Sequence, residues 1–148
     1  MVERLEVGTG GATTLVGEAG SGKSTLLGTI GSRAGRAGVR VVRLSGVESQ
    51  PDLPWAAVAE VCLPFEHLLD RVGAVRARAL RGALALEAAS APIDGLAVAL
   101  GMLGLLAEAG AERPVLVLVD DLQWVDAESR AVLGFLGRRL GDDPVALI

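Results

Sequence analysis

The chain has few of the side chains on which several classes of protein depend. Of its 148 residues, one is cysteine (Cys62) and one is histidine (His67), so neither an internal disulfide nor a zinc site of clustered cysteine and histidine can form. No basic run occurs, and the formal net charge is -4 with a pI near 5.0. These features exclude an electrostatic nucleic-acid footprint within the chain and fit a reducing, cytoplasmic setting.

Long apolar runs are also missing. The most apolar stretch, Leu96 to Ala107, has twelve residues, whereas a membrane span needs roughly twenty. The first residues, Met1–Val7, alternate charged and apolar side chains and lack the apolar core of a signal peptide. Because hydrophobic residues make up 51% of the chain, we expect a folded domain without a membrane segment. In it the apolar stretch is a buried helix that packs closely through Gly101 and Gly104.

Lysine is nearly absent: thirteen of the 14 basic residues are arginine, and the remaining one is Lys23. This lysine lies in Gly17-Glu-Ala-Gly-Ser-Gly-Lys-Ser24, which matches the phosphate-binding pattern G-x-x-x-x-G-K-[ST]. The β-branched, apolar segment Ala12–Val16 before it predicts a short buried strand. The apolar spacing after it predicts a helix that starts near Lys23 and ends at Gly35 or Gly38. Strand, glycine-rich loop and helix is the order that a P-loop requires.

The residue types of this loop suit a nucleoside triphosphate with Mg²⁺. Glycines let successive backbone N–H groups point at one anion, and the helix start adds the positive end of its dipole. The Lys23 ammonium would reach the β- and γ-phosphates, and the Ser24 hydroxyl would ligate Mg²⁺. Thr25 either supports the α-phosphate or is simply a residue of the first helical turn. The predicted cofactor-binding residues are Gly17, Glu18, Ala19, Gly20, Ser21, Gly22, Lys23, Ser24 and Thr25.

A second part of the nucleotide site is predicted where Val115–Val119 ends. These five apolar residues are typical of a strand buried on both faces of a parallel sheet. Open α/β sheets bind ligands at the carboxyl ends of their strands. There Asp120 would hold Mg²⁺ through water, and Asp121 would orient the attacking water, so that Lys23 and Asp121 are the predicted catalytic residues. Without the P-loop, the two carboxylates would be explained equally well as an acidic, solvated turn.

The segment Leu118–Leu140, which begins Leu-Val-Asp-Asp-Leu-Gln-Trp-Val-Asp, resembles the Walker B region of bacterial AAA/STAND-type regulatory ATPases. It is especially similar to the large ATP-binding transcriptional regulators of the LuxR type. The P-loop and Asp52–Trp55 also look like that group, and the resemblance extends over most of the chain, from Thr14 to Ile148. The resemblance implies an α/β fold with a doubly wound parallel sheet of the P-loop NTPase (ASCE/AAA-like) type.

The resemblance also implies a function and its partners. Such proteins are ATP-binding switches in which slow Mg-ATP hydrolysis controls an attached effector, commonly a DNA-binding helix-turn-helix. ATP-dependent self-association is a further implied interaction, and DNA contact is expected only through an effector domain absent from this chain. The glycine-arginine element that precedes the P-loop in the family, its phosphate-sensing arginine and its sensor repeats are also missing. We therefore expect residues 1–148 to form a single, partial domain, incomplete at both ends, of a longer protein.

Four residues of the D-D-x-Q-W-x-D pattern need comment. Fast ATPases of this type usually carry glutamate at the position of Asp121, so the shorter aspartate favours slow, switch-like hydrolysis. Asp126 belongs to the pattern, but it also precedes an apolar helix, and an N-cap role is favoured over a direct functional one. Gln123 either approaches the γ-phosphate and its water or is an exposed turn residue. Trp124 serves either in core packing or in contact with a partner.

Between the predicted second strand, Val39–Leu44, and the strand at Val115 the pattern indicates a helical insertion. The expected helices there are Ala56–Cys62 and Phe65–Val72, separated by Pro64, then Ala74–Ala89, and Leu96–Ala109 with Asp94 as its cap. A last helix is expected at Ala127–Leu140, with Val132, Leu133, Leu136 and Leu140 on one face and Gly141 as its stop. Asp143–Ile148 is expected to begin a core strand, which in the family lies between the P-loop strand and the Walker B strand.

Three functions are compatible with these motifs. The first is the ATP-binding core of a regulatory switch, and the second is a binding module that holds nucleotide without hydrolysing it. The third is a P-loop kinase, although kinases usually add an arginine-rich lid and seldom carry the D-D-x-Q-W-x-D pattern. A GTPase with the guanine-binding element [NT]-K-x-D is excluded, because Lys23 is the one lysine of the chain.

Overall fold

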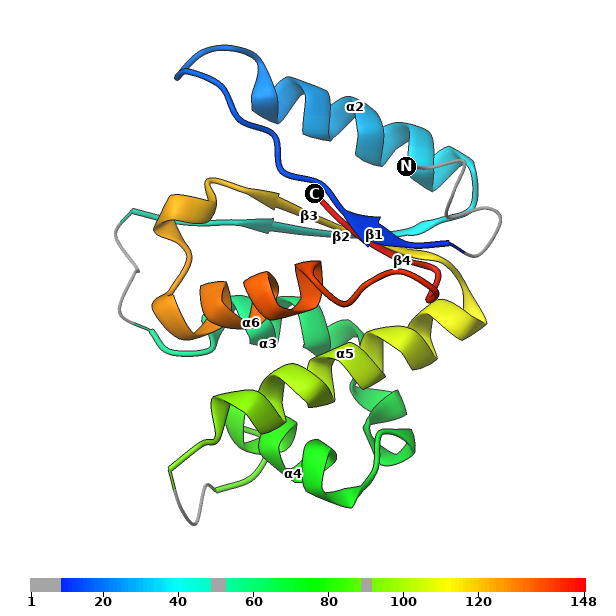
Figure 1. Ribbon diagram of the computed structural model, residues 1–148, viewed down its shortest axis with the longest axis vertical. Helices are drawn as coiled ribbons and strands as arrows, with labels where there is room; N and C mark the ends of the chain where they lie inside the picture. The colour runs from blue at the N-terminus through cyan, green and yellow to red at the C-terminus, as the bar shows by residue number, and fades with distance from the viewer. Residues whose placement is uncertain (1–8, 49–52, 89–91) are drawn as a thin grey trace.

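The computed structural model describes residues 9–48, 53–88 and 92–148. In this part of the chain a four-stranded parallel sheet has the order β1-β4-β3-β2 (Figure 1). Its strands are β1 (Gly11–Ala12), β2 (Arg40–Ser45), β3 (Val115–Asp120) and β4 (Val145–Leu147). The predicted parallel α/β fold is confirmed, and β4 lies between the P-loop strand and the Walker B strand as expected.

Strand β3 is an inner strand of the sheet, between β4 and β2, and the side chains of Val115–Leu118 are buried on both of its faces. Leu116 and Leu118 share one apolar cluster with Leu27 of the helix that follows the P-loop, whereas Val115 and Val117 belong to the cluster on the opposite face. This alternation follows from the two-residue period of a strand. The continuous apolar run of β3 therefore reflects a strand covered from both sides, as predicted.

Helices cover the two faces unequally. Within the described residues, α2 packs alone on one face, and α3, α5 and α6 pack on the other, with α4 farther from the sheet (Figure 1). The helical elements are α2 (Lys23–Arg36), α3 (Ala56–Cys62), the 3₁₀ helix η1 (Leu63–Arg71), α4 (Ala74–Ala83), α5 (Gly95–Glu112), the short 3₁₀ helix η2 (Leu122–Trp124) and α6 (Ala127–Gly137). The insertion between β2 and β3 is helical, as predicted.

Helix α5 is long and apolar enough to cross a membrane by length and composition alone. In the fold it is a core helix, since it contacts η1, α4, α6 and two strands. Asp94 caps it by accepting the N–H groups of Leu96 and Ala97. A Cβ at Gly101 would lie 2.8 Å from Leu80 Cγ, and one at Gly104 would lie 2.9 Å from Val72 Cγ1. The predicted cap and the predicted close packing through these glycines are both confirmed.

The P-loop strand is shorter than predicted. The expectation was a buried strand over Ala12–Val16, but β1 ends at Ala12, and Val16 is 92% exposed. The reason is that β1 lies at the edge of the sheet and has β4 as its one partner, so its ladder ends where Thr13 N–H donates to Leu147 O. Beyond this bond the chain leaves the sheet toward the P-loop.

Three helix boundaries also differ from the predictions. Pro64 does not separate two helices: it occupies the first turn of η1, where a missing N–H costs nothing, and η1 follows α3 directly. Helix α4 ends at Ala83, not Ala89, because Ala85 adopts φ 54° and the N–H of Leu86 closes onto Arg81 O. Helix α6 ends at Gly137, before Leu140 and Gly141. The expectations for Met1–Val7, Asp52 and Ala89 fall outside the described residues.

Candidate functional site

The glycine-rich loop runs from Gly17 to Gly22 and delivers the chain into α2. Gly20 (φ 78°) and Gly22 (φ 85°) have left-handed backbone, which glycine adopts without strain. Gly22 is the N-cap of α2, and no side chain caps this helix. The first N–H groups of a helix have no partner within the helix, so the start of α2 offers them to an anion.

Gly17 has a different role from the one expected of it. Its backbone is not left-handed, but a Cβ there would lie 2.7 Å from the hydroxyl oxygen of Ser21. The N–H of Ser21 also donates to Glu18 O, at 3.2 Å. Gly17 therefore leaves space for the Ser21 hydroxyl, and the left-handed backbone conformations of the loop are found at Gly20 and Gly22.

Lys23 folds back over the loop that precedes it. Its Nζ donates to Gly17 O and to Glu18 O, each at 2.8 Å. Two backbone carbonyl oxygens thus hold the ammonium against the loop. Lysine presents a compact charge with three donors, which suits both these carbonyls and a phosphate.

Two carboxylates follow β3. Asp120 Oδ1 accepts the N–H of Asp121 at 3.0 Å, and Asp121 Oδ1 accepts Gln123 Nε2 at 2.9 Å. Asp121 has left-handed backbone (φ 51°, ψ 47°), which turns the chain sharply out of the sheet into η2. The end of β3 therefore presents one carboxylate within the sheet and a second one on a tight turn just beyond it.

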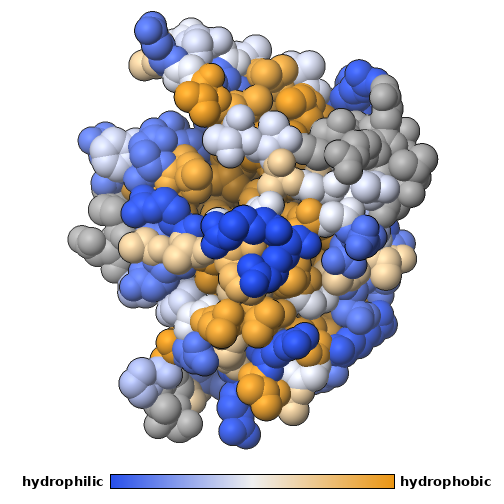
Figure 2. Space-filling view, in the orientation of Figure 1, coloured by the Kyte–Doolittle hydropathy of each residue, from blue (hydrophilic) through white to orange (hydrophobic). Residues whose placement is uncertain are grey.

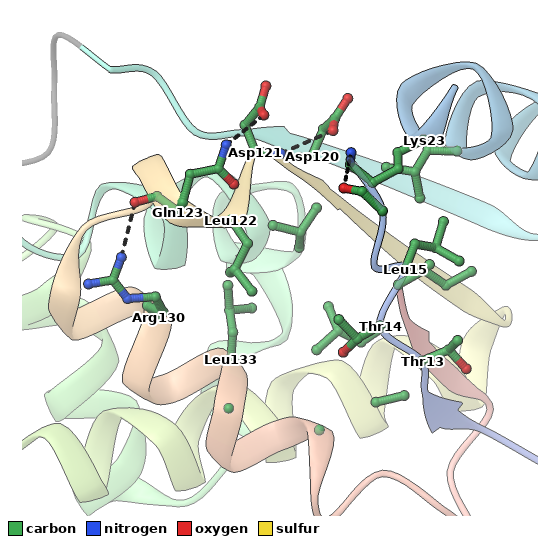
Figure 3. A pocket seen from close by; sticks show the side chains of 18 of the residues that line it. Thr13, Thr14, Leu15, Lys23, Asp120, Asp121, Leu122, Gln123, Arg130 and Leu133 are labelled. Atoms are coloured by element: carbon green, nitrogen blue, oxygen red, sulfur yellow. Dashed lines mark hydrogen bonds between the residues drawn. The ribbon is translucent and has the colours of Figure 1, made fainter. Parts of the chain in front are cut away.

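A pocket of about 820 Å³ lies between the glycine-rich loop, the end of β3 and α6. Figure 3 shows Lys23, Asp120 and Asp121 along one rim of it, and Figure 2 shows apolar surface inside the hollow beneath α2. The predicted site residues that line the pocket are Gly17, Ala19, Lys23, Asp120 and Asp121. Those outside its lining are Glu18, Gly20, Ser21, Gly22, Ser24 and Thr25. The pocket thus brings the lysine and both carboxylates together, and the start of α2 lies beside it.

One wall of the pocket was not anticipated from the sequence. Helix α6 contributes Arg130, Leu133, Gly134 and Gly137, which are spaced by three, four and seven residues and so share a helical face. This periodicity was visible in the sequence, but no residue marked the face as part of a site. The Arg130 guanidinium donates to Gln123 O and Val125 O at 3.2 and 3.3 Å, so it secures the turn after β3.

Asp126 is the N-cap of α6, as favoured from the sequence: its Oδ1 accepts the N–H of Ser129 at 2.9 Å. It also accepts two N–H groups from the start of α3, those of Trp55 (3.0 Å) and Ala57 (3.3 Å). This second role could not be read from the sequence, because the partners are about seventy residues away along the chain.

The sequence left two alternative roles open for Gln123 and two for Trp124, and the structure shows where each side chain lies. Gln123 is exposed and lines the pocket while its amide donates to Asp121. Trp124 is 37% exposed, and its backbone packs over Gly46, where a Cβ would lie 2.9 Å from the carbonyl carbon of Trp124. Gln123 is therefore an exposed turn residue that also faces the pocket, which agrees with both alternatives, and Trp124 lies at the surface of the turn.

The residues predicted to hold Mg²⁺ are Ser24 and Asp120. Among the described residues no group of three or more histidine, cysteine or acidic side chains could hold a metal ion. Mg²⁺ usually keeps several waters and takes one or two protein oxygens together with phosphate oxygens. The predicted ligands, Ser24 and Asp120, are both accessible to solvent; Asp120 lines the pocket, whereas Ser24 lies outside its lining.

Comparison with protein families matches residues 1–148 to the family described as the AAA ATPase domain. Searches of curated proteins and of solved structures each gave no significant match.

Proposed function

Because the chain belongs to the AAA ATPase domain family, an ATPase-type nucleotide-binding module, we propose that it is the ATP-binding core of a regulatory ATPase switch. The observation that carries this proposal is that Lys23, Asp120 and Asp121 line one pocket. An uncapped helix start preceded by left-handed glycines adjoins that pocket. A positive loop and two carboxylates facing one space suit a triphosphate with its divalent cation.

In this proposal each residue has a distinct task. The N–H groups at the start of α2 bind phosphate oxygens, and Lys23 exchanges its bonds to Gly17 O and Glu18 O for bonds to the β- and γ-phosphates. Ser24 and Asp120 hold Mg²⁺, which when bound neutralises charge on the phosphates. Ser24 lies in α2 and Asp120 in β3, so the ion would be held between these two elements.

Asp121 is proposed to orient the attacking water. Its Oδ1 is engaged by Gln123, which leaves Oδ2 available, and the turn that carries it is fixed by Arg130. Aspartate is one methylene shorter than the glutamate usual at this position, so its reach to a water beside the γ-phosphate is reduced. Slow hydrolysis, as in a switch, is the rate that this arrangement favours.

The wider role in this proposal rests on the resemblance to LuxR-type regulators with their D-D-x-Q-W-x-D pattern. We propose that the domain acts in the cytoplasm, controls an attached effector that contacts DNA, and associates with itself in an ATP-dependent way. The formal net charge of -4 does not favour DNA binding by this domain itself.

Calorimetric titration of Mg-ATP into the chain tests the binding site. Hydrogen bonds to charged groups contribute roughly 1.5–3 kcal/mol, so Lys23→Ala is expected to weaken binding about tenfold to a hundredfold. Arg78→Ala removes the same charge from an exposed position on α4 and is the matched control, with unchanged affinity. If Lys23→Ala binds as tightly as the parent chain, the P-loop assignment is wrong.

The main alternative is a module that binds nucleotide without hydrolysing it. The bond from Gln123 to Asp121 supports this alternative, because it occupies one oxygen of the proposed water-orienting carboxylate. Phosphate release by the parent chain and by Asp121→Asn distinguishes the two functions. We expect Asp121→Asn to bind Mg-ATP as the parent chain does and to release phosphate more slowly. Equal rates of phosphate release by the two chains would rule out hydrolysis by this site.

A further inference from the structure

The first turn of α3 is capped by side chains of α6. Asp126 accepts the N–H groups of Trp55 and Ala57, and Ser129 Oγ accepts the N–H of Val58 at 3.0 Å. The remaining first-turn N–H groups are satisfied by the backbone, that of Ala56 by Leu53 O and that of Ala59 by Trp55 O. Every donor at the start of α3 thus has a partner, and three of them depend on α6.

This capping is built into the core rather than added at the surface. Asp126 is 4% exposed and Ser129 is fully buried, whereas α3 has no side-chain cap of its own. Its N-cap residue, Trp55, has φ 66°, which is uncommon for a bulky side chain. A buried carboxylate is stabilised here by the N-termini of two helices at once, α3 and α6.

The same carboxylate lies at the end of the turn that forms the pocket wall. Within this turn, Trp124 N–H donates to Asp121 O and Val125 N–H donates to Leu122 O. Arg130, one residue after Ser129, holds two further carbonyl oxygens of the turn. The turn that leads from Asp121 to Asp126 is therefore cross-linked by hydrogen bonds along its length.

We infer that Asp126 and Ser129 are positioning residues that couple the pocket wall to α3. Through α3 and η1, which follow each other directly, the coupling reaches the helical layer beneath the sheet. The inference rests on the proposed function, because it takes the occupant of the pocket to be Mg-ATP. In this inference, nucleotide binding in the pocket changes the environment of α3 through the hydrogen bonds of Asp126 and Ser129.

The chain provides its own reporter for this coupling. It contains two tryptophans and no tyrosine, and Trp55 stands at the start of α3 whereas Trp124 belongs to the turn. In Trp124→Phe, tryptophan fluorescence therefore comes from Trp55 alone. Trp55 does not line the pocket. A change in its emission on nucleotide binding would therefore report a change around α3 and not direct contact with the nucleotide.

The experiment measures Mg-ATP binding by calorimetry and Trp55 emission in the same Trp124→Phe chain. We expect a saturable change in emission with the calorimetric midpoint. Ser129→Ala removes one of the three hydrogen bonds that α6 makes to α3, and we expect it to reduce the amplitude roughly twofold or more while affinity stays within about threefold. Ser32→Ala, on the exposed surface of α2, is the matched control with unchanged amplitude.

The outcomes separate this inference from the proposed function. If calorimetry detects no binding of Mg-ATP to the parent chain, both are overturned. If Mg-ATP binds but Trp55 emission does not change, or if the change survives in full in Ser129→Ala, only the coupling is overturned. If the Asp126→Asn variant folds, we expect it to abolish the emission change. If it does not fold, the Ser129→Ala variant alone tests the coupling. A purely structural cap would lower the stability of both variants and leave the nucleotide-dependent emission intact.

Discussion

At the scale of single residues, the turn after β3 depends on a glycine outside both motifs. A Cβ at Gly46 would lie 2.3 Å from Asp121 O and 2.9 Å from the carbonyl carbon of Trp124. Both neighbours belong to the backbone of the turn and cannot rotate away as a side chain could. Gly46 also donates its N–H to Asp120 O, so it holds the backbone in place at the point where the chain leaves β3.

We expect Gly46→Ala to lower the free energy of unfolding by about 1–3 kcal/mol, as overpacking does, and to weaken Mg-ATP binding. Gly28→Ala is the matched control: a Cβ there meets nothing within 4 Å, and the position lies inside α2. Alanine in a helix interior is favoured over glycine by about 1 kcal/mol, so this variant should be more stable than the parent. Urea unfolding of both variants measures the two effects, and a stable, fully binding Gly46→Ala would contradict the account of the turn.

At the scale of elements, the sequence predicted well wherever local pattern decides structure. The bounds of α3, the extent of β3 and the Asp94 cap of α5 follow from apolar runs and capping chemistry within a few residues. The extent of β1 did not follow, because Ala12–Val16 has the composition of a strand and its short pairing depends on an edge position. The link from Asp126 to α3 was equally hidden, since it joins residues that are adjacent only after folding.

The two aspartate caps should therefore differ in their energetic contribution. Asp94 is exposed and caps α5 alone, so Asp94→Ala should cost about 1 kcal/mol. Asp126→Ala leaves two buried N–H groups and one partly buried N–H group, that of Trp55, without an acceptor, and we expect a loss of about 3 kcal/mol at roughly 1 kcal/mol for each group. Denaturant unfolding of both variants in parallel checks the order; equal losses would mean that the bonds from α3 to Asp126 contribute nothing.

At the scale of the whole molecule, Cys62 reports on the integrity of the larger core. The thiol lies at the end of α3 in the cluster that joins the sheet to α3, α5 and α6, and it is fully buried. Burial raises the pKa of the Cys62 thiol from its ordinary value of 9.0 to about 12, because a thiolate would be desolvated there. The thiol is therefore neutral in the folded chain and becomes reactive only when the core opens.

This difference makes stability depend on alkaline pH. Between about pH 9 and about pH 12 the unfolded chain loses the thiol proton while the folded chain keeps it. The unfolded state then binds fewer protons, so the free energy of unfolding falls by up to roughly 1.4 kcal/mol for each pH unit. From pH 8 to pH 10.5 we expect a loss of about 2 kcal/mol.

Urea unfolding at these two pH values measures the loss, and Cys62→Ala, which has no thiol, should lack it. The measurement is unusually clean in this chain, because it has no tyrosine and one lysine to titrate in the same range. An identical pH dependence in the two chains would show that the thiol does not contribute.

The hydrogen bonds of Lys23 to Gly17 O and Glu18 O also affect the rate at which a nucleotide binds. To pair with both the β- and γ-phosphates, as proposed, the ammonium exchanges its hydrogen bonds of 2.8 Å to Gly17 O and Glu18 O for bonds to phosphate oxygens. Association is then an encounter followed by an exchange of partners, and its observed rate should level off as ligand concentration rises. That plateau is the rate at which Lys23 exchanges its two loop carbonyls for phosphate oxygens within the encounter complex, a kinetic property that this short segment sets.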